Sequence, residues 1–192
     1  MKIIELLSHS QASNTYIIES DEAAVIVDCG ATLDEVERHL SKPVAAILLS
    51  HGHFDHIFEL EAYYKRFGCL IYGGQNIVNK LLKCEKNLSK DYSDRLVEVP
   101  PEITQKVVEL SEQKLNIKDI EICCITLPGH SECGMGYLID NHLFCGDTLF
   151  EKCVGRYDLY DSSFKSLRAS LKKINGLNVE HFYPGHGRSF TQ

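Results

Sequence analysis

The feature that most restricts how this chain can fold is a six-residue cluster of three histidines and one aspartate, His51-Gly52-His53-Phe54-Asp55-His56. The apolar run 44–49 before it predicts a buried strand. Neither a continued strand nor a helix would bring the four polar side chains together. They converge only if the chain bends, with Gly52 permitting the bend and a helix beginning at Asp55. The cluster therefore predicts a cation at a strand-to-helix corner; the alternative is a polar loop rich in histidine.

Three isolated residues, His130, Asp147 and His186, occur in similar surroundings. Each follows a run that is typical of a strand, and each has a glycine immediately before it. Any one of them alone would be interpreted as a loop residue. Together with the cluster they make five imidazoles and two carboxylates. Such a set can hold two metal ions at low coordination number and leave positions open for water.

The rest of the chain predicts alternating strands and helices in two β-rich halves. A capping box at Thr32–Glu35 begins a helix that ends before Pro43. A second helix is expected from about Asp55 to Phe67, with Ile57, Leu60 and Tyr64 inward and Gly68 as its stop. A late helix carries Phe164, Leu167, Leu171 and Ile174, with Asp161 or Ser162 as its cap, and residues 75–92 form a polar helical excursion. Strands are expected over 15–19, 23–27, 107–110, 120–127, 136–139, 142–145 and 179–183. This order predicts a mixed α/β layered domain over 1–192.

Length and charge restrict the partners. A chain of 192 residues suits one substantial domain, and its formal charge of −7, with no basic run longer than Lys172-Lys173, argues against nucleic acid and for a small-molecule substrate. No stretch approaches the roughly 18 apolar residues that a membrane span needs. Glu5 interrupts the N-terminal apolar run, so no signal peptide is expected. Eight cysteines without a C-x-x-C pair then favour a reducing cytoplasm and buried thiols. Oligomeric state is left open.

These motifs resemble the metallo-β-lactamase superfamily, and more closely its glyoxalase II-like (hydroxyacylglutathione hydrolase-like) branch. The resemblance runs from about Asn14 to Gly187. It rests on His-x-His-x-Asp-His at 51–56, Pro128-Gly129-His130, Gly146-Asp147-Thr148-Leu149-Phe150, Gly155-Arg156 and Pro184-Gly185-His186-Gly187. Glyoxalase II proper resembles this domain followed by a helical segment that contacts glutathione, and this sequence ends at Gln192 without one.

The resemblance implies a four-layer αββα sandwich, with two mixed sheets flanked by helices and two divalent metal ions between the sheets at one edge. It also implies the ligands: His51, His53 and His130 on the first ion, Asp55, His56 and His186 on the second, and Asp147 bridging them. Zinc is favoured, with iron or manganese as alternatives, because imidazole and carboxylate ligands accept each of these metals.

The chemistry expected of such a site is attack of a metal-bridging hydroxide on a carbonyl, with Asp55 orienting the hydroxide as well as ligating. A thioester of the hydroxyacylglutathione type is favoured, because a thiolate leaving group needs little acid assistance. Asp28 is interpreted either as the partner of a ligand histidine or as a strand-end residue that bonds its own loop. Arg156 and Tyr157 are candidate contacts for an anionic substrate group; a structural Arg156 that bonds loop carbonyls is the alternative.

Other functions remain open at this point. Persulfide dioxygenases resemble much of this motif set but use one iron and molecular oxygen. Lactone or phosphodiester hydrolysis is also compatible with the site, and so is a metal-binding module without catalysis. Common secreted metallo-β-lactamases have a cysteine among their second-site ligands, whereas Asp147 and His56 stand here. Turnover of a panel of thioesters, lactones and persulfides would separate these classes.

Overall fold

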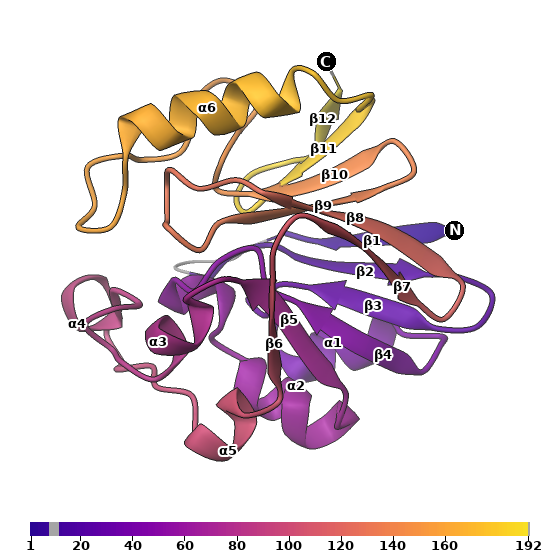
Figure 1. The fold of residues 1–192 in the computed structure, drawn as a ribbon. Coiled ribbons are helices and arrows are strands. Elements are labelled where there is room, and N and C mark those ends of the chain that lie inside the picture. The colour runs from indigo at the N-terminus through magenta and orange to yellow at the C-terminus, as the bar shows by residue number, and fades with distance from the viewer. Residues whose placement is uncertain (8–11, 192) are drawn as a thin grey trace.

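Two mixed β-sheets lie face to face in the computed structural model, which describes residues 1–7 and 12–191 (Figure 1). The first sheet has the order β1-β2-β3-β4-β5-β6, with parallel pairing from β3 to β6. Its strands are β1 (Lys2–Leu6), β2 (Thr15–Glu19), β3 (Ala24–Val27), β4 (Val44–Leu48), β5 (Leu70–Gly74) and β6 (Val107–Leu110). The remaining pairs of this sheet, β1 with β2 and β2 with β3, are antiparallel.

The second sheet has the order β12-β11-β10-β9-β8-β7. Its strands are β7 (Gln113–Ile117), β8 (Ile120–Thr126), β9 (Met135–Ile139), β10 (His142–Gly146), β11 (His181–Pro184) and β12 (Phe190–Thr191). All neighbours are antiparallel except β10 and β11. Strands β8, β10 and β11 therefore point the same way, and their carboxyl ends reach the same edge of the sheet.

Helices cover the outer faces of both sheets (Figure 1). Helix α6 (Phe164–Ile174) lies on the second sheet. The first sheet is accompanied by α1 (Leu33–His39), α2 (Leu60–Phe67), α3 (Ile77–Leu81), α4 (Ser89–Tyr92) and α5 (Pro101–Thr104). No helix among the described residues is long and apolar enough to cross a lipid bilayer.

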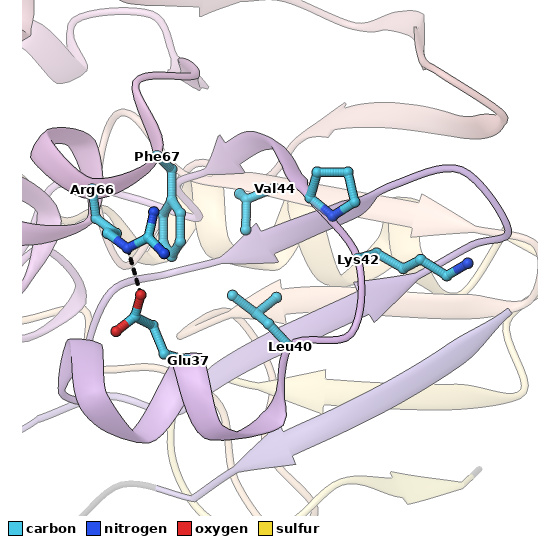
Figure 2. A pocket seen from close by; sticks show the side chains of 7 residues that line it. Glu37, Leu40, Lys42, Val44, Arg66 and Phe67 are labelled. Carbon is cyan, nitrogen blue, oxygen red and sulfur yellow. Dashed lines mark hydrogen bonds and ion pairs between the residues drawn. The ribbon is translucent and has the colours of Figure 1, made fainter.

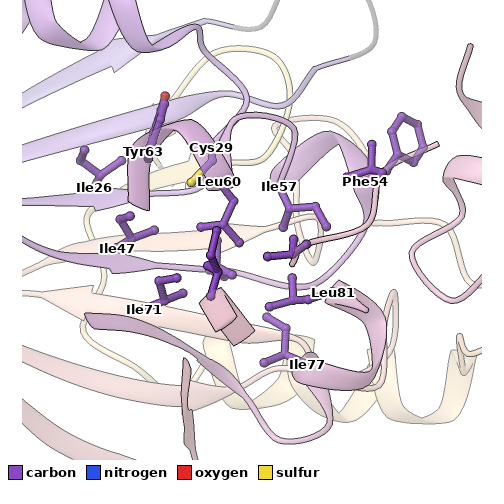
Figure 3. Packing of buried hydrophobic residues seen from close by; sticks show 14 of the residues in the cluster. Ile26, Cys29, Ile47, Phe54, Ile57, Leu60, Tyr63, Ile71, Ile77 and Leu81 are labelled. Atoms are coloured by element: carbon purple, nitrogen blue, oxygen red, sulfur yellow. The ribbon is translucent and has the colours of Figure 1, made fainter. Parts of the chain in front are cut away.

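Three apolar clusters fill the three spaces between the layers. Alternate residues of a strand face opposite sides, so a sheet that is covered on both faces is apolar on both. On the helix side of the first sheet, Ile26, Ile47 and Ile71 from neighbouring strands pack with Leu60 and Tyr63 of α2 (Figure 3). A second cluster, between the sheets, includes Val25, Val27, Leu48, Ile122, Tyr137 and Phe144. A third, between the second sheet and α6, includes Leu143, Phe182 and Ile174. The αββα expectation is confirmed.

Local signals predicted two of the helix ends correctly, the start of α1 and the end of α2. Thr32 Oγ1 accepts from the Glu35 N–H at 3.3 Å, as the capping box predicts. Gly68 ends α2 with φ +62°, in the left-handed region that favours glycine. For α6, however, the cap is Ser163, whose side chain accepts from the Ser166 N–H, and the prediction of Asp161 or Ser162 was wrong.

The helix expected from Asp55 was also wrong at its start. Residues 54–56 form one turn of 3-10 helix, and α2 begins at Leu60. The backbone between them bonds elsewhere: the His56 carbonyl accepts from Cys29 N–H, and Glu59 N–H donates to the Cys29 carbonyl. In α2, Tyr63 is fully buried and lies at the centre of the helix's inner face, whereas Tyr64, which was predicted to face inward, is half-buried. The assignment of 1–192 to one domain stays a prediction.

Candidate metal centre

The seven candidate ligands come from four loops at one edge of the sandwich. The cluster 51–56 follows β4, His130 follows β8, Asp147 follows β10 directly, and His186 follows β11. These strands end at the edge where the loops meet, which is why residues up to 135 positions apart become neighbours. The structure brings all seven side chains together.

Three ring nitrogens converge in the first group, His51, His53 and His130. His53 Nδ1 lies 3.0 Å from His51 Nε2 and 3.0 Å from His130 Nε2. A tetrahedral zinc ion with bonds of about 2.0–2.1 Å would hold its nitrogen ligands roughly 3.3 Å apart. The spacing of the three nitrogens therefore fits a shared cation.

The second group is Asp55, His56 and His186, and Asp147 lies between the two groups. Asp55 Oδ2 lies 3.0 Å from His186 Nε2 and 3.6 Å from His56 Nε2. Asp147 Oδ2 lies 3.4 Å from His130 Nε2 and 3.6 Å from His186 Nε2. Its other oxygen, Oδ1, lies 3.4 Å from His56 Nε2. One carboxylate thus faces both groups, which is the geometry of a bridge.

Unpaired polar atoms show that this arrangement fits a metal. Among the described residues, the buried side-chain nitrogen and oxygen atoms without a hydrogen bond are His53 Nε2, His56 Nε2, Asp147 Oδ1 and Asp161 Oδ1. All of them lie in or directly beside the centre. A buried polar group left unpaired costs about 1–3 kcal/mol, and a cation would satisfy the two atoms that face inward, His56 Nε2 and Asp147 Oδ1.

Gly185 is required for this close approach. A Cβ at this position would lie 2.1 Å from Asp147 Oδ1 and 2.6 Å from His56 Cε1. Any larger residue would therefore displace the carboxylate or the imidazole. Close packing thus explains why a glycine precedes His186 in the sequence. This glycine allows the chain after β11 to place His186 beside the cluster 51–56.

Asp28 orients two of the histidines from behind. Its Oδ1 accepts from Ser50 N–H at 2.7 Å, and its Oδ2 accepts from Ser50 Oγ at 2.7 Å and from His56 Nδ1 at 2.8 Å. Ser50 Oγ also lies 3.1 Å from His51 Nδ1. This network assigns the proton of each ring to Nδ1, so both Nε2 lone pairs point to the centre. His130 is held in the same way, with Nδ1 3.0 Å from the Arg156 carbonyl.

His53 has a different neighbour, which sequence reasoning missed. Its Nδ1 points inward, and its Nε2 faces Asp161 Oδ1 at 3.8 Å. Asp161 Oδ2 accepts from Lys80 Nζ at 2.6 Å and from Ser131 Oγ at 3.0 Å. Lys80 is only 1% exposed, because its stem packs on Gly52. No motif signals this buried ion pair, since Asp161 resembled a helix cap and Lys80 one lysine of a polar helix.

Burial and neighbouring charges both shift the pKa values of these groups, in the same direction for His51 and in opposite directions for His56 and Asp147. Burial lowers the pKa of His51 well below its ordinary value, and the imidazoles of His56 and His53 lower it further. Burial would also lower the pKa of His56, but the surrounding carboxylates, Asp28 first, raise it well above its ordinary value. Burial would raise the pKa of Asp147, but its histidine neighbours hold it below the usual range. Without a metal, a proton on His56 balances the carboxylates, and a cation would compete with that proton.

A cavity of about 410 Å³ opens above the centre. Its floor includes His53, Asp55, His130, Asp147 and His186, and Arg156 lines its wall. Tyr157 lies outside the described lining: it is 51% exposed, and its ring packs on Phe164 with centroids 4.9 Å apart.

A separate hollow of about 350 Å³ lies between α1, the end of α2 and the start of β4 (Figure 2). Arg66 and Glu37 form an ion pair across it, and Leu40, Val44 and Phe67 supply its apolar wall. Its described lining contains none of the seven candidate ligands.

The chain belongs to the metallo-beta-lactamase superfamily, whose family model matches residues 11–186. A probable metallo-hydrolase of Streptococcus pyogenes serotype M6 is 30% identical over 100% of this chain and 86% of that protein. A hydroxyacylglutathione hydrolase of Shewanella pealeana is 28% identical over 88% of this chain, which spans about half (53%) of that protein. Superfamily membership is thus shown, whereas the glyoxalase II-like branch is supported here by a partial match.

Two solved structures are similar over nearly their whole length. The BLEG-1 B3 metallo-beta-lactamase superposes with a TM-score of 0.90 at 27% identity, covering 99% of this chain and 94% of that one. TTHA1623 in a di-iron-bound form superposes with a TM-score of 0.84 at 27% identity, covering 98% and 94%. The sequence relatives and the solved structures therefore both support the fold and the family's association with metals. These relatives favour the class of metal-dependent hydrolases.

Proposed function

We propose that this protein is a hydrolase that uses two divalent metal ions, and that its substrate is a thioester. The observation that carries the proposal is the convergence of seven donor side chains on two adjoining points, with the Asp147 carboxylate facing both. The two groups and their spacing support a binuclear rather than a mononuclear site. Relatives described as probable metallo-hydrolases support the hydrolase class.

In this proposal His51, His53 and His130 hold one ion, Asp55, His56 and His186 hold the other, and Asp147 contacts both. Bound there, the ions supply Lewis acidity and water with a pKa lowered toward 7. Zinc suits these ligands, and so does iron, which the di-iron form of TTHA1623 contains.

The side chains contribute orientation and charge. Burial would raise the pKa of Asp55, but His56 and His186 hold it below the usual range, so this carboxylate stays ionised. It lines the cavity and can accept a hydrogen bond from the attacking water, which orients the oxygen toward the substrate carbonyl. Ser50 and Asp28 keep the rings of His51 and His56 in one tautomer throughout.

The leaving group favours a thioester. A thiol has a pKa near 8.5, so a thiolate leaves at neutral pH with little help from an acid, whereas an amine or alkoxide needs a proton. Among the described residues that line the cavity, every carboxylate and every imidazole is already a candidate ligand, and a thiolate leaving group does not require a further acid. Hydrolysis of thioesters is therefore the reaction that this site supports best.

The test combines metal analysis with a substrate panel. Protein purified without added metal is analysed for metal content and then assayed with S-lactoylglutathione, an S-acyl-N-acetylcysteamine, a lactone, a phosphodiester, a β-lactam and a persulfide. We expect about two metal ions per chain and turnover of thioesters, lost in His186→Asn and retained in the matched control His142→Asn, whose histidine lies on β10 away from the centre.

Other outcomes would identify the alternatives. One iron per chain with oxygen consumption would indicate the persulfide dioxygenase. Turnover confined to the lactone, phosphodiester or β-lactam would replace the substrate class. No turnover of any compound by metal-loaded protein would favour the non-catalytic binding module.

A further inference from the structure

The wall of the cavity above the metal centre is mostly apolar. Its described lining outside the candidate ligands consists of Arg156 and seven other side chains, Phe54, Leu88, Tyr92, Phe150, Cys153, Val154 and Leu159. They come from three segments, the 51–56 turn, the residues around α4, and the loop that follows β10. A volume of about 410 Å³ lies within the range of small-molecule sites.

The part of this wall that Phe54 and Leu88 form is held in place by hydrogen bonds within the protein. Phe54 N–H donates to the Asn87 carbonyl at 2.9 Å, which ties the histidine turn to the residue before Leu88. The Asn87 side chain is buried and donates to the carbonyls of Lys80 and Val97 at 3.2 Å and 2.6 Å. Leu88 itself has φ +70°, a backbone conformation that is unusual for a bulky residue, and it is only 6% exposed. The surrounding bonds hold this apolar side chain in place at the cavity.

The same wall provides little positive charge that could bind an anionic group of a substrate. Arg156 is the one lysine or arginine among the described lining residues. Its guanidinium is already engaged by Asp158, with Nε 2.9 Å from Oδ1 and Nη2 3.1 Å from Oδ2. The guanidinium also lies over the Tyr92 ring, 5.7 Å from its centroid. A substrate carboxylate would have to compete with Asp158 for this cation.

We propose that the substrate is an uncharged acyl thioester whose apolar chain packs against Phe54, Leu88 and Phe150, and not an anionic glutathione thioester. The inference rests on the proposed function and adds the substrate class to it. Apolar burial contributes roughly fourfold per methylene, so lengthening the acyl chain should raise kcat/KM by about that factor until the cavity is full.

The experiment uses metal-loaded protein and a series of S-acyl-N-acetylcysteamines from acetyl to octanoyl, with S-lactoylglutathione as the anionic comparison. We expect kcat/KM to rise at least tenfold from acetyl to hexanoyl and to exceed the value for S-lactoylglutathione. A flat series, or a preference for S-lactoylglutathione, would overturn the inference and leave thioester hydrolysis intact.

Two variants test the wall and its charge separately. Leu88→Asn replaces the apolar side chain with one that tolerates a positive φ, so the backbone can keep its path, and the preference for hexanoyl over acetyl should fall about tenfold. Leu96→Asn is the matched control, because Leu96 is 67% exposed and lines another hollow. Asp158→Asn frees Arg156, and it should shift the preference several-fold toward S-lactoylglutathione. An unchanged preference in both Leu88→Asn and Asp158→Asn would contradict the inference.

A binding measurement separates this inference from the proposed function. The thioethers S-hexyl- and S-ethyl-N-acetylcysteamine cannot be hydrolysed, and their affinities are measured by calorimetry. Tighter binding of the hexyl compound, lost in Leu88→Asn, would support the apolar site even if no thioester were turned over. Equal affinities would count against it whatever the enzyme activity.

Discussion

Replacing Asp28 with asparagine should weaken metal binding without unfolding the protein. Asp28 has φ +59°, which asparagine tolerates, so the backbone can keep its path. The amide oxygen can keep the bond from Ser50 N–H, but the amide NH2 then takes the place of Oδ2. There it meets two donors, Ser50 Oγ and His56 Nδ1, at the positions where the carboxylate oxygen accepts at 2.7 and 2.8 Å.

The expected magnitude follows from the tautomer of His56. To accept from the amide, His56 must carry its proton on Nε2, the atom that faces Asp55 and Asp147. That proton occupies the position that a cation needs. Loss of such a supporting carboxylate typically costs 10–100-fold in metal affinity, or about 1.4–2.7 kcal/mol.

The assay is competition for zinc or cobalt against a chromophoric chelator, read for each of the two binding steps. We expect the step that involves His56 to weaken by about 10–100-fold. Asp34→Asn, which changes an exposed carboxylate in α1, is the matched control and should bind as wild type. If Asp28→Asn bound both ions with unchanged affinity, the assignment of the His56 tautomer would be refuted.

Three further predictions concern stability and sterics. Lys80→Met leaves the Asp161 carboxylate buried without its cation, and urea unfolding of metal-free protein should show a loss of about 3–5 kcal/mol; a loss below 1 kcal/mol would contradict the buried pair. Burial would raise the pKa of the Glu19 carboxyl, but hydrogen bonds from Ser41 lower it, so this carboxylate stabilises the fold fully above the unfolded-state pKa near 4.3. The stabilisation is lost as the pH falls through the lower folded-state pKa. Glu19→Gln should therefore flatten the loss of stability at acid pH, and parallel stability curves for variant and wild type would contradict this role of Glu19. Gly185→Ala pushes a methyl group into the Asp147 carboxylate, so calorimetry should show at least about tenfold weaker metal binding, and wild-type affinity would contradict the steric argument.

The histidine cluster and the glycine-preceded residues were predictable because their signals are local. A buried strand that is closely followed by His51-Gly52-His53 presents those side chains at a sheet edge, and the same holds for the strands before Asp147 and His186. The αββα layers could be inferred from the family resemblance, and the capping box at Thr32 from chemistry alone.

What the sequence did not predict depends on contacts between distant segments. Lys80 and Asp161 lie 81 positions apart in the sequence, and nothing local distinguishes Asp161 from a helix cap, so their ion pair could not be predicted. Strand β5 was missed because it ends in Gly73-Gly74, which locally suggests a turn. The fold needs both glycines there: a Cβ at Gly73 would meet Ile77 Cδ1 at 2.6 Å, and one at Gly74 would meet the Cys133 carbonyl at 2.2 Å.

Because the candidate ligands come from both sheets, metal binding should affect the stability of the whole sandwich. Four of the seven follow a strand of the first sheet, and three follow strands of the second. Each of the two proposed ions would take ligands from both sheets, so each would act as a non-covalent crosslink between the two halves of the polypeptide. At a free concentration one thousand times its Kd, such an ion adds about 4.1 kcal/mol to the stability of the native state. Chelation should therefore render the whole protein, and not only its active site, easier to digest with protease.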